Sequence, residues 1–362
     1  MKALLALEDG SVYEGIAVGS SGTKYGELVF TTGMTGYQEV LTDPSYAGQI
    51  ILFTFPLIGN YGTFDEFQES TKIYARGAVA KELNDMSFTE IENLTNYLIK
   101  NKTLMITNID TRAITLKLRN YGVMKAAISS ELNESELIEL VKKAPGLSEE
   151  NLIKEVTSSE KVIYKPTSQA IIPLKIGVMD FGVKKGIINA LLNRGCEVVV
   201  FPAFTSFEEI LKENLDGLIL SNGPGDPKNV QFAIKNIKNL IGKLPIFGIC
   251  LGHQLLSLAL GCETYKLKFG HRGSNHPVID LKIKKAFITT QNHGFAVSEK
   301  GLDKNIKITH INANDKTIEG IECPDYNIFS VQFHPEACPG PNDTDYLFDK
   351  FIRLILKEEA NA

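Results

Sequence analysis

Short apolar runs separated by helical patterns dominate the second half of the chain. Each run is apolar at nearly every position, which is typical of parallel strands buried on both faces. After one of these runs, leucines recur at helical spacing until Gly261 ends the pattern. We therefore expect a mostly parallel sheet with functional residues at the carboxyl ends of its strands. The expected strands are 175–180, 197–201, 218–220, 246–249 and 328–333.

The first half of the chain has a different pattern. Short predicted strands are followed by a helix with a capping box formed by Ser87 and Glu90. A second helix is expected to begin at Asp110 or Thr111 and to end at Gly122. These elements predict a separate, smaller α/β domain.

Helix-breaking residues between Lys161 and Pro173 divide the two patterned regions. The sequence therefore predicts an N-terminal domain at 1–165 and a C-terminal α/β domain at 174–362. A chain of 362 residues is long enough for both.

Composition and charge narrow the class of protein. Hydrophobic residues make up 43% of the chain, charged residues 22%, and the formal net charge is −5. This balance favours a soluble protein without affinity for nucleic acid or membranes. The first apolar run is too short for a signal peptide, and the five cysteines form no C-x-x-C pair, so we expect a cytoplasmic protein without a zinc site.

Candidate chemistry begins at Cys250, in the sequence Gly248-Ile-Cys-Leu-Gly252 between a predicted strand and a predicted helix. In a G-x-S-x-G elbow, small flanking residues let the chain turn sharply and expose the nucleophile. The pentapeptide alone also fits an inert buried cysteine. Its position between strand and helix favours a thiol nucleophile.

A thiol nucleophile needs a base and a group that orients the base. His334 follows the last predicted strand, and Glu336 lies two residues further on, where its carboxylate could fix the imidazole tautomer. His253 is a competing base, but its place in the first turn after the elbow favours a packing or hydrogen-bonding role.

Oxyanion donors are expected in the loop Ser221-Asn-Gly-Pro-Gly-Asp-Pro227. Its glycines, Gly223 and Gly225, allow a close backbone approach, and the N–H of Gly223 could pair with that of Leu251. A tight turn without a chemical role is the alternative. Positions 271–277 contain His271 and His276 and are expected to form a polar turn instead of a metal site.

The segments SNGPGDP, GICLGHQ and FHPEA, in this order, resemble the class I (triad) glutamine amidotransferases. The resemblance covers Lys175 to the C-terminus. It implies that Cys250 attacks glutamine, that His334 is the base and that Glu336 orients it, with a γ-glutamyl thioester as intermediate. It also implies that glutamine is bound by Gly223, Gly225, Leu251, Gln254, Asn292, Gly294 and Phe295, of which the last three lie in a substrate-contact loop at 291–296.

The first half resembles the small subunits of carbamoyl-phosphate synthase through residues 31–46 and Ile109-Asp-Thr-Arg112. The second half agrees through 269–277 and 338–344, with Ser274 as a small departure. This resemblance implies that Ser45, otherwise a turn residue, reaches the bound L-glutamine. It also implies a large ATP-dependent partner subunit that holds ATP and Mg²⁺, receives ammonia and makes carbamoyl phosphate for pyrimidines and arginine, while this chain itself holds no cofactor.

Several alternatives are weighed against this interpretation. An amidotransferase subunit for GMP, CTP or anthranilate synthesis would lack the segment at 31–46. A non-catalytic adaptor would not need Cys250, His334 and Glu336. A cysteine peptidase would act without a synthetase partner. The resemblance implies a heterodimer with the large subunit that serves pyrimidine synthesis, arginine synthesis or both.

Overall fold

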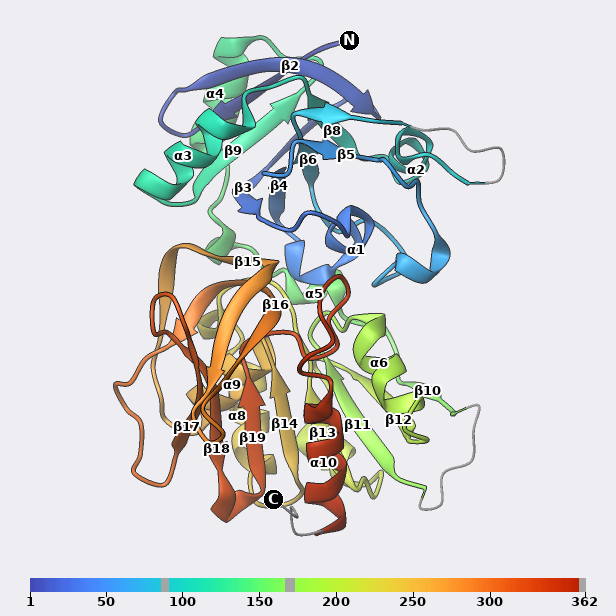
Figure 1. Ribbon diagram of the computed structural model, residues 1–362, viewed down its shortest axis with the longest axis vertical. Coiled ribbons are helices and arrows are strands. Elements are labelled where there is room, and N and C mark those ends of the chain that lie inside the picture. The colour runs from blue at the N-terminus through green and yellow to red at the C-terminus, as the bar shows by residue number, and fades with distance from the viewer. Residues whose placement is uncertain (86–90, 167–172, 358–362) are drawn as a thin grey trace. The chain divides into compact units, whose positions relative to one another are not determined.

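The computed structural model describes residues 1–85, 91–166 and 173–357, and it divides the chain into two compact units, Met1–Leu152 and Ile153–Ala362 (Figure 1). The division comes earlier in the chain than the predicted linker at 161–173. Strand β10 (Val162–Tyr164) pairs with β12 (Glu197–Pro202) and is therefore part of the second unit's sheet.

The first unit is built around a closed barrel with strand order β1-β2-β8-β6-β4-β3-β9. The barrel mixes parallel pairs, such as β3–β4, with antiparallel pairs, and β1 closes it against β9. A barrel has no unpaired strand edge, so these short strands satisfy one another's backbone groups. The strands are β1 (Lys2–Leu7), β2 (Val12–Gly19), β3 (Thr23–Thr31), β4 (Gln49–Phe53), β6 (Gly77–Val79), β8 (Leu104–Thr107) and β9 (Met124–Ser129). Strands β5 (Leu57–Ile58) and β7 (Glu82–Leu83) form a separate pair.

Helices α1 (Tyr37–Thr42), α2 (Leu94–Lys100), α3 (Thr111–Tyr121) and α4 (Glu134–Lys143) accompany the barrel. The α3 prediction is confirmed, with Asp110 as N-cap and Gly122 as C-cap. The predicted capping box of Ser87 and Glu90 lies outside the described residues. Among the described residues, the next helix is α2, where the Asn93 side chain accepts a hydrogen bond from Asn96 N–H.

The second unit contains a ten-stranded sheet with strand order β10-β12-β11-β13-β14-β19-β18-β16-β15-β17. The run from β12 to β19 is parallel, which confirms the predicted strands. The strands on the far side of β19 pair in antiparallel fashion. The strands not yet given are β11 (Lys175–Asp180), β13 (Gly217–Leu220), β14 (Ile246–Ile249), β15 (Thr264–Asp280), β16 (Lys285–Val297), β17 (Lys307–Asn312), β18 (Ile318–Cys323) and β19 (Ile328–Val331).

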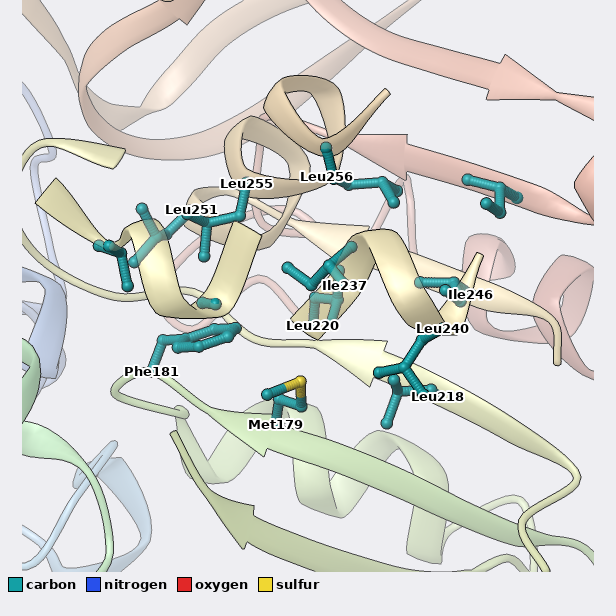
Figure 2. Close-up of a cluster of buried hydrophobic side chains, with 14 of the residues drawn as sticks. Met179, Phe181, Leu218, Leu220, Ile237, Leu240, Ile246, Leu251, Leu255 and Leu256 are labelled. Atoms are coloured by element: carbon teal, nitrogen blue, oxygen red, sulfur yellow. The ribbon is translucent and has the colours of Figure 1, made fainter. Parts of the chain in front are cut away.

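Helices cover both faces of the parallel strands, which explains why those strands are apolar at nearly every position. On one face α7, α8 and α9 pack on the sheet, and Figure 2 shows Leu251 and Leu255 of α9 in this cluster with Phe181. On the other face α6 and α10 contribute to a second cluster. The helices of this unit are α5 (Ile153–Val156), α6 (Lys185–Leu192), α7 (Phe207–Leu211), α8 (Gln231–Leu240), α9 (Leu251–Ala259) and α10 (Tyr346–Leu356).

Two sequence predictions about the antiparallel part were wrong. Residues 271–277, expected to form a polar turn, lie inside β15, and residues 291–296, expected to form a loop, lie inside β16. The two strands pair over most of their length, with register shifts between Lys266 and His271 and between Gly273 and His276. Such irregularities place Gly, Asn and Pro inside a strand, so the composition imitates a turn.

None of the helices in the described parts of the chain is long and apolar enough to cross a membrane.

Candidate active site

Cys250 lies at the junction of β14 and α9, where the sequence predicts an elbow. Its φ is +53° and ψ is −104°, a conformation that non-glycine residues rarely adopt and that typically costs about 1–3 kcal/mol. Its N–H donates to the Val331 carbonyl of β19, while Gly252 N–H donates to the Ser221 carbonyl. The neighbouring strands therefore hold the turn in place on both sides.

Close packing explains why glycine flanks Cys250. A Cβ atom on Gly252 would lie 2.1 Å from the Leu220 carbonyl oxygen, which is far inside van der Waals contact. Only glycine lets the first turn of α9 approach β13 this closely. The elbow geometry thus follows from the Gly-x-Cys-x-Gly sequence.

His334 and Glu336 lie together after β19, as predicted. His334 Nδ1 is 2.6 Å from Glu336 Oε1, so Nδ1–H donates to the carboxylate, and both side chains are buried. His334 N–H donates to the Thr290 carbonyl, which fixes the segment against β16. The ring nitrogen Nε2 has no hydrogen-bond partner among the described residues, so it is available to exchange a proton.

Charge at this site favours an imidazolium. Burial opposes the charged form of His334, but the nearby Glu336 carboxylate and Cys250 outweigh it, and the pKa of His334 is raised. Burial likewise opposes the charged form of Glu336, but Lys184 and His334 lower the pKa of that carboxyl. Cysteine attacks carbonyl groups as the thiolate, and a neighbouring imidazolium is a charge that stabilises a thiolate once its proton has left.

Lys184 is a further charged residue of this site, and no sequence motif predicts it. Its Nζ lies 3.0 Å from Glu336 Oε1 and donates to the Ala337 and Cys338 carbonyls, and its side chain is 2% exposed. Lys184 comes just after β11, at the carboxyl end of a buried strand. That position is where open α/β sheets hold functional groups, and it could have identified this residue.

The predicted oxyanion residues lie side by side. A Cβ atom on Gly223 would lie 2.2 Å from the Phe181 carbonyl oxygen and 2.8 Å from Leu251 Cδ2. The loop before it is held by Ser221, whose hydroxyl accepts from Phe181 N–H. Gly225, in the same loop, has a φ of +92°, which favours glycine.

The residues of β16 that are predicted to bind glutamine lie next to Cys250 and α9. Cys250 Sγ donates to the Asn292 carbonyl at 3.5 Å. Gln254 Nε2 donates to the Phe295 carbonyl at 2.9 Å and to Gln332 Oε1 at 3.1 Å. Gly294 lies between Asn292 and Phe295 in β16. Ser45 belongs to the first unit, where its N–H donates to Asp43 Oδ1.

His253 has the structural role that the sequence favoured. Its side chain is fully buried, and Nδ1 forms a 2.8 Å hydrogen bond with Ser330 Oγ of β19. Burial, together with nearby His310, lowers the pKa of His253 to about 3, so the ring is neutral. The helix therefore uses this histidine to dock on the sheet.

Family models of known proteins match both units of the chain. A family model described as glutamine amidotransferase class-I matches residues 177–354, and one described as carbamoyl-phosphate synthase small chain, CPSase domain, matches residues 5–128. Among solved structures, a glutamine amidotransferase from Thermotoga maritima is 17% identical with a TM-score of 0.38, over 52% of this chain and 86% of its own.

The second unit is thus a class I glutamine amidotransferase domain. The carbamoyl phosphate synthase small chain of Clostridium acetobutylicum is 48% identical over 98% of this chain and 100% of its own length. That of Methanocaldococcus jannaschii is 49% identical over 98% and 99%. The chain belongs to the carbamoyl phosphate synthase small chain family.

Proposed function

We propose that this chain is the glutamine-hydrolysing subunit of a carbamoyl phosphate synthase and that Cys250, His334 and Glu336 carry the reaction. The observation that supports the assignment is the junction of β14 and α9, where a strained cysteine lies beside a buried histidine–glutamate pair. Full-length similarity to small chains supports the choice of synthase.

The reaction follows from the charges at the site. The Cys250 thiolate attacks the glutamine carboxamide carbon, and the oxyanion that forms accepts hydrogen bonds from the Gly223 and Leu251 amides. His334 then donates its Nε2 proton to the leaving ammonia, which yields a γ-glutamyl thioester. The same imidazole, now neutral, takes a proton from water, which attacks the thioester and releases glutamate.

Lys184 acts through Glu336 in this scheme. By compensating the carboxylate inside the protein, it keeps Glu336 ionised next to His334 Nδ1. Glu336 then fixes the tautomer in which Nε2 faces the reaction. Lys184 is therefore a positioning residue for the histidine.

The partner we propose is a large synthetase subunit that binds ATP and Mg²⁺, receives the ammonia and joins it to bicarbonate. The name of the family supports a second, larger chain, and this sequence carries no G-x-x-x-x-G-K-[ST] phosphate loop. Pyrimidine and arginine synthesis both consume carbamoyl phosphate, and either fits this chain.

The test is glutamine hydrolysis measured with and without the large subunit, ATP and bicarbonate. We expect weak activity alone, strong stimulation in the complex, and near silence in Cys250→Ser because the covalent route is lost. Cys196→Ser is the matched control, since burial raises the pKa of that thiol to about 11 and makes it inert.

Undiminished hydrolysis by Cys250→Ser would overturn the nucleophile assignment. Stimulation by a GMP or anthranilate synthetase subunit, in place of the carbamoyl phosphate synthase subunit, would overturn the choice of partner.

A further inference from the structure

A second cluster of titratable side chains lies in the antiparallel part of the sheet. His271 of β15, His293 of β16 and Glu319 of β18 are all buried, and each has one nitrogen or oxygen atom within 4.8 Å of those of the other two. Glutamine hydrolysis as proposed above uses none of these three side chains. Their burial and convergence therefore need another explanation.

The hydrogen bonds of His271 leave one nitrogen facing the cluster. Its Nε2 is bonded to Asp315 Oδ2 at 2.8 Å, while its Nδ1 lies 3.4 Å from Glu319 Oε1. Within the described parts of the chain, neither Nδ1 of His271 nor Oε2 of Glu319 has a hydrogen-bond partner. A buried polar atom without a partner is costly, so this pair of atoms is suited to a ligand.

His293 also uses one ring nitrogen for a hydrogen bond outside the cluster. Its Nδ1 lies 2.8 Å from the Phe295 carbonyl, which can only accept, so Nδ1 carries the proton. Its Nε2 lies within hydrogen-bond distance, 3.1 Å, of Oε1 of the Gln291 side-chain amide, so the Gln291 side chain must turn away before Nε2 can bind an ion. Both histidines thus use one nitrogen to bind a carboxylate or carbonyl, as metal-ligating histidines almost always do.

We propose that His271 Nδ1, His293 Nε2 and Glu319 form a binding site for one divalent transition-metal ion of the zinc type. Two imidazoles and one carboxylate are a ligand set that suits zinc. Ligand atoms around tetrahedral zinc are about 3.4 Å apart, given bonds of about 2.0–2.1 Å. The His271–Glu319 separation of 3.4 Å fits this spacing, whereas the three ligand atoms as a set lie within 4.8 Å of one another, so side-chain rotation must bring them closer around an ion.

The fourth position can be filled by water or by His276. The His276 ring centroid lies 5.3 Å from that of His271, and its Nε2 atom is buried without a partner among the described residues. Asp315 would then act as the outer partner that orients His271.

An ion here would act on the catalytic segment. His293 directly follows Asn292, whose carbonyl accepts from Cys250 Sγ. Metal binding would hold this part of β16 in place without touching the reacting atoms.

The experiment measures metal binding by the full chain in a Cys250→Ser background, so that the catalytic thiolate cannot take the ion. After treatment with chelator, the protein is titrated with Co²⁺ and then with Zn²⁺ as competitor. We expect one Co²⁺ per chain with the strong visible absorption of four-coordinate cobalt, displaced by one Zn²⁺. Glu319→Gln should weaken binding by at least about ten-fold.

Glu322→Gln is the matched control, because it makes the same change on β18 at a side chain that pairs with Lys350 outside the cluster. It should bind like the parent. Asp315→Asn, at a half-exposed side chain, should lower affinity about 10- to 100-fold and provides a variant with little risk of misfolding.

Absence of stoichiometric binding would overturn the proposal and leave a metal-free ion pair in which His271 is protonated between Asp315 and Glu319. Equal affinity in Asp315→Asn, Glu319→Gln and Glu322→Gln would overturn it as well. Because the readout is binding to a chain without its nucleophile, failure here is independent of the glutaminase assignment.

Discussion

Single residues at the active site are coupled by charge. Lys184 and Glu336 form an ion pair whose side chains are 2% and 0% exposed, and Glu336 also accepts from His334. A buried charge that loses its partner typically destabilises a protein by about 3–5 kcal/mol, although the intact pair adds little stability by itself. The pair therefore serves to hold an ionised carboxylate beside the histidine.

Removing one charge of the Lys184–Glu336 pair should lower the free energy of unfolding more than removing both charges. We expect Lys184→Met to lower the free energy of unfolding by about 3–5 kcal/mol and to reduce the rate of glutamine hydrolysis, because Glu336 then favours its neutral form. Lys184→Met combined with Glu336→Gln should regain part of the stability but none of the activity. Urea unfolding and steady-state glutaminase assays measure the two effects.

If the double variant loses as much free energy of unfolding as the two single variants lose together, the two residues are not coupled and Lys184 has only a packing role.

At the scale of elements, the fit of α9 against the sheet depends on a missing side chain. The Cβ of Gly252→Ala would meet the Leu220 carbonyl oxygen at 2.1 Å, and a backbone atom cannot move aside cheaply. We expect a loss of about 1–3 kcal/mol in unfolding free energy, with a loss of glutaminase activity as the elbow shifts.

Gly146→Ala is the control for this change. Its added Cβ would lie 3.5 Å from Glu149 Oε1 and its φ is −76°, so both stability and activity should be close to those of the parent. A Gly252→Ala protein that is as stable and active as the control would contradict the packing argument.

The docking of α9 by His253 makes stability depend on pH. Burial lowers the pKa of His253 to about 3 in the folded state, whereas an unfolded histidine titrates near 6.5. The unfolded chain therefore binds more protons below pH ~6.5, so the stability this group provides is complete above that pH and declines towards pH 3.

The pH slope of unfolding checks this. Between pH ~6 and 5 the free energy of unfolding should fall with a contribution from this group of about 1.4 kcal/mol per pH unit, and His253→Asn should remove that contribution. If His253→Asn has the same pH slope as the parent, the His253 ring of the parent is already charged in the folded state at this pH.

For the whole molecule, the resemblance assigns one glutamine contact to the first unit. Ser45 lies in the short helix Pro44–Tyr46, and the sequence Thr31 to Tyr46 carries the likeness to small chains. We expect Ser45→Ala to raise the KM for glutamine, since a hydrogen bond typically contributes about 0.5–1.5 kcal/mol. Ser135→Ala in α4 should leave KM unchanged. Equal KM values in the two variants would remove Ser45 from the site.

Much of the molecule follows from local sequence. The parallel strands are predicted correctly because burial on both faces requires continuous apolar runs, and α3 is predicted correctly because Asp110 and Gly122 supply its caps. The elbow at Cys250 is equally local, since it depends on glycines at fixed offsets.

The antiparallel strands β15 and β16 show where local patterns fail. Their irregular register admits Gly, Asn and Pro, which elsewhere mark turns, so pairing with a distant partner overrides the local signal. Lys184 was missed for a related reason. A lone lysine carries no motif, and its role is defined only by Glu336, which lies 152 positions further along the chain.

The sequence by itself determined the parallel sheet and the family resemblance, and it predicted Cys250 as the nucleophile and His334 as its base, because each depends on residues close together or in a fixed pattern. Only the tertiary structure decided the Lys184 ion pair, the neutral buried His253 and the convergence of His271, His293 and Glu319. Charge and desolvation depend on neighbours in space, and those neighbours come from strands far apart in the chain.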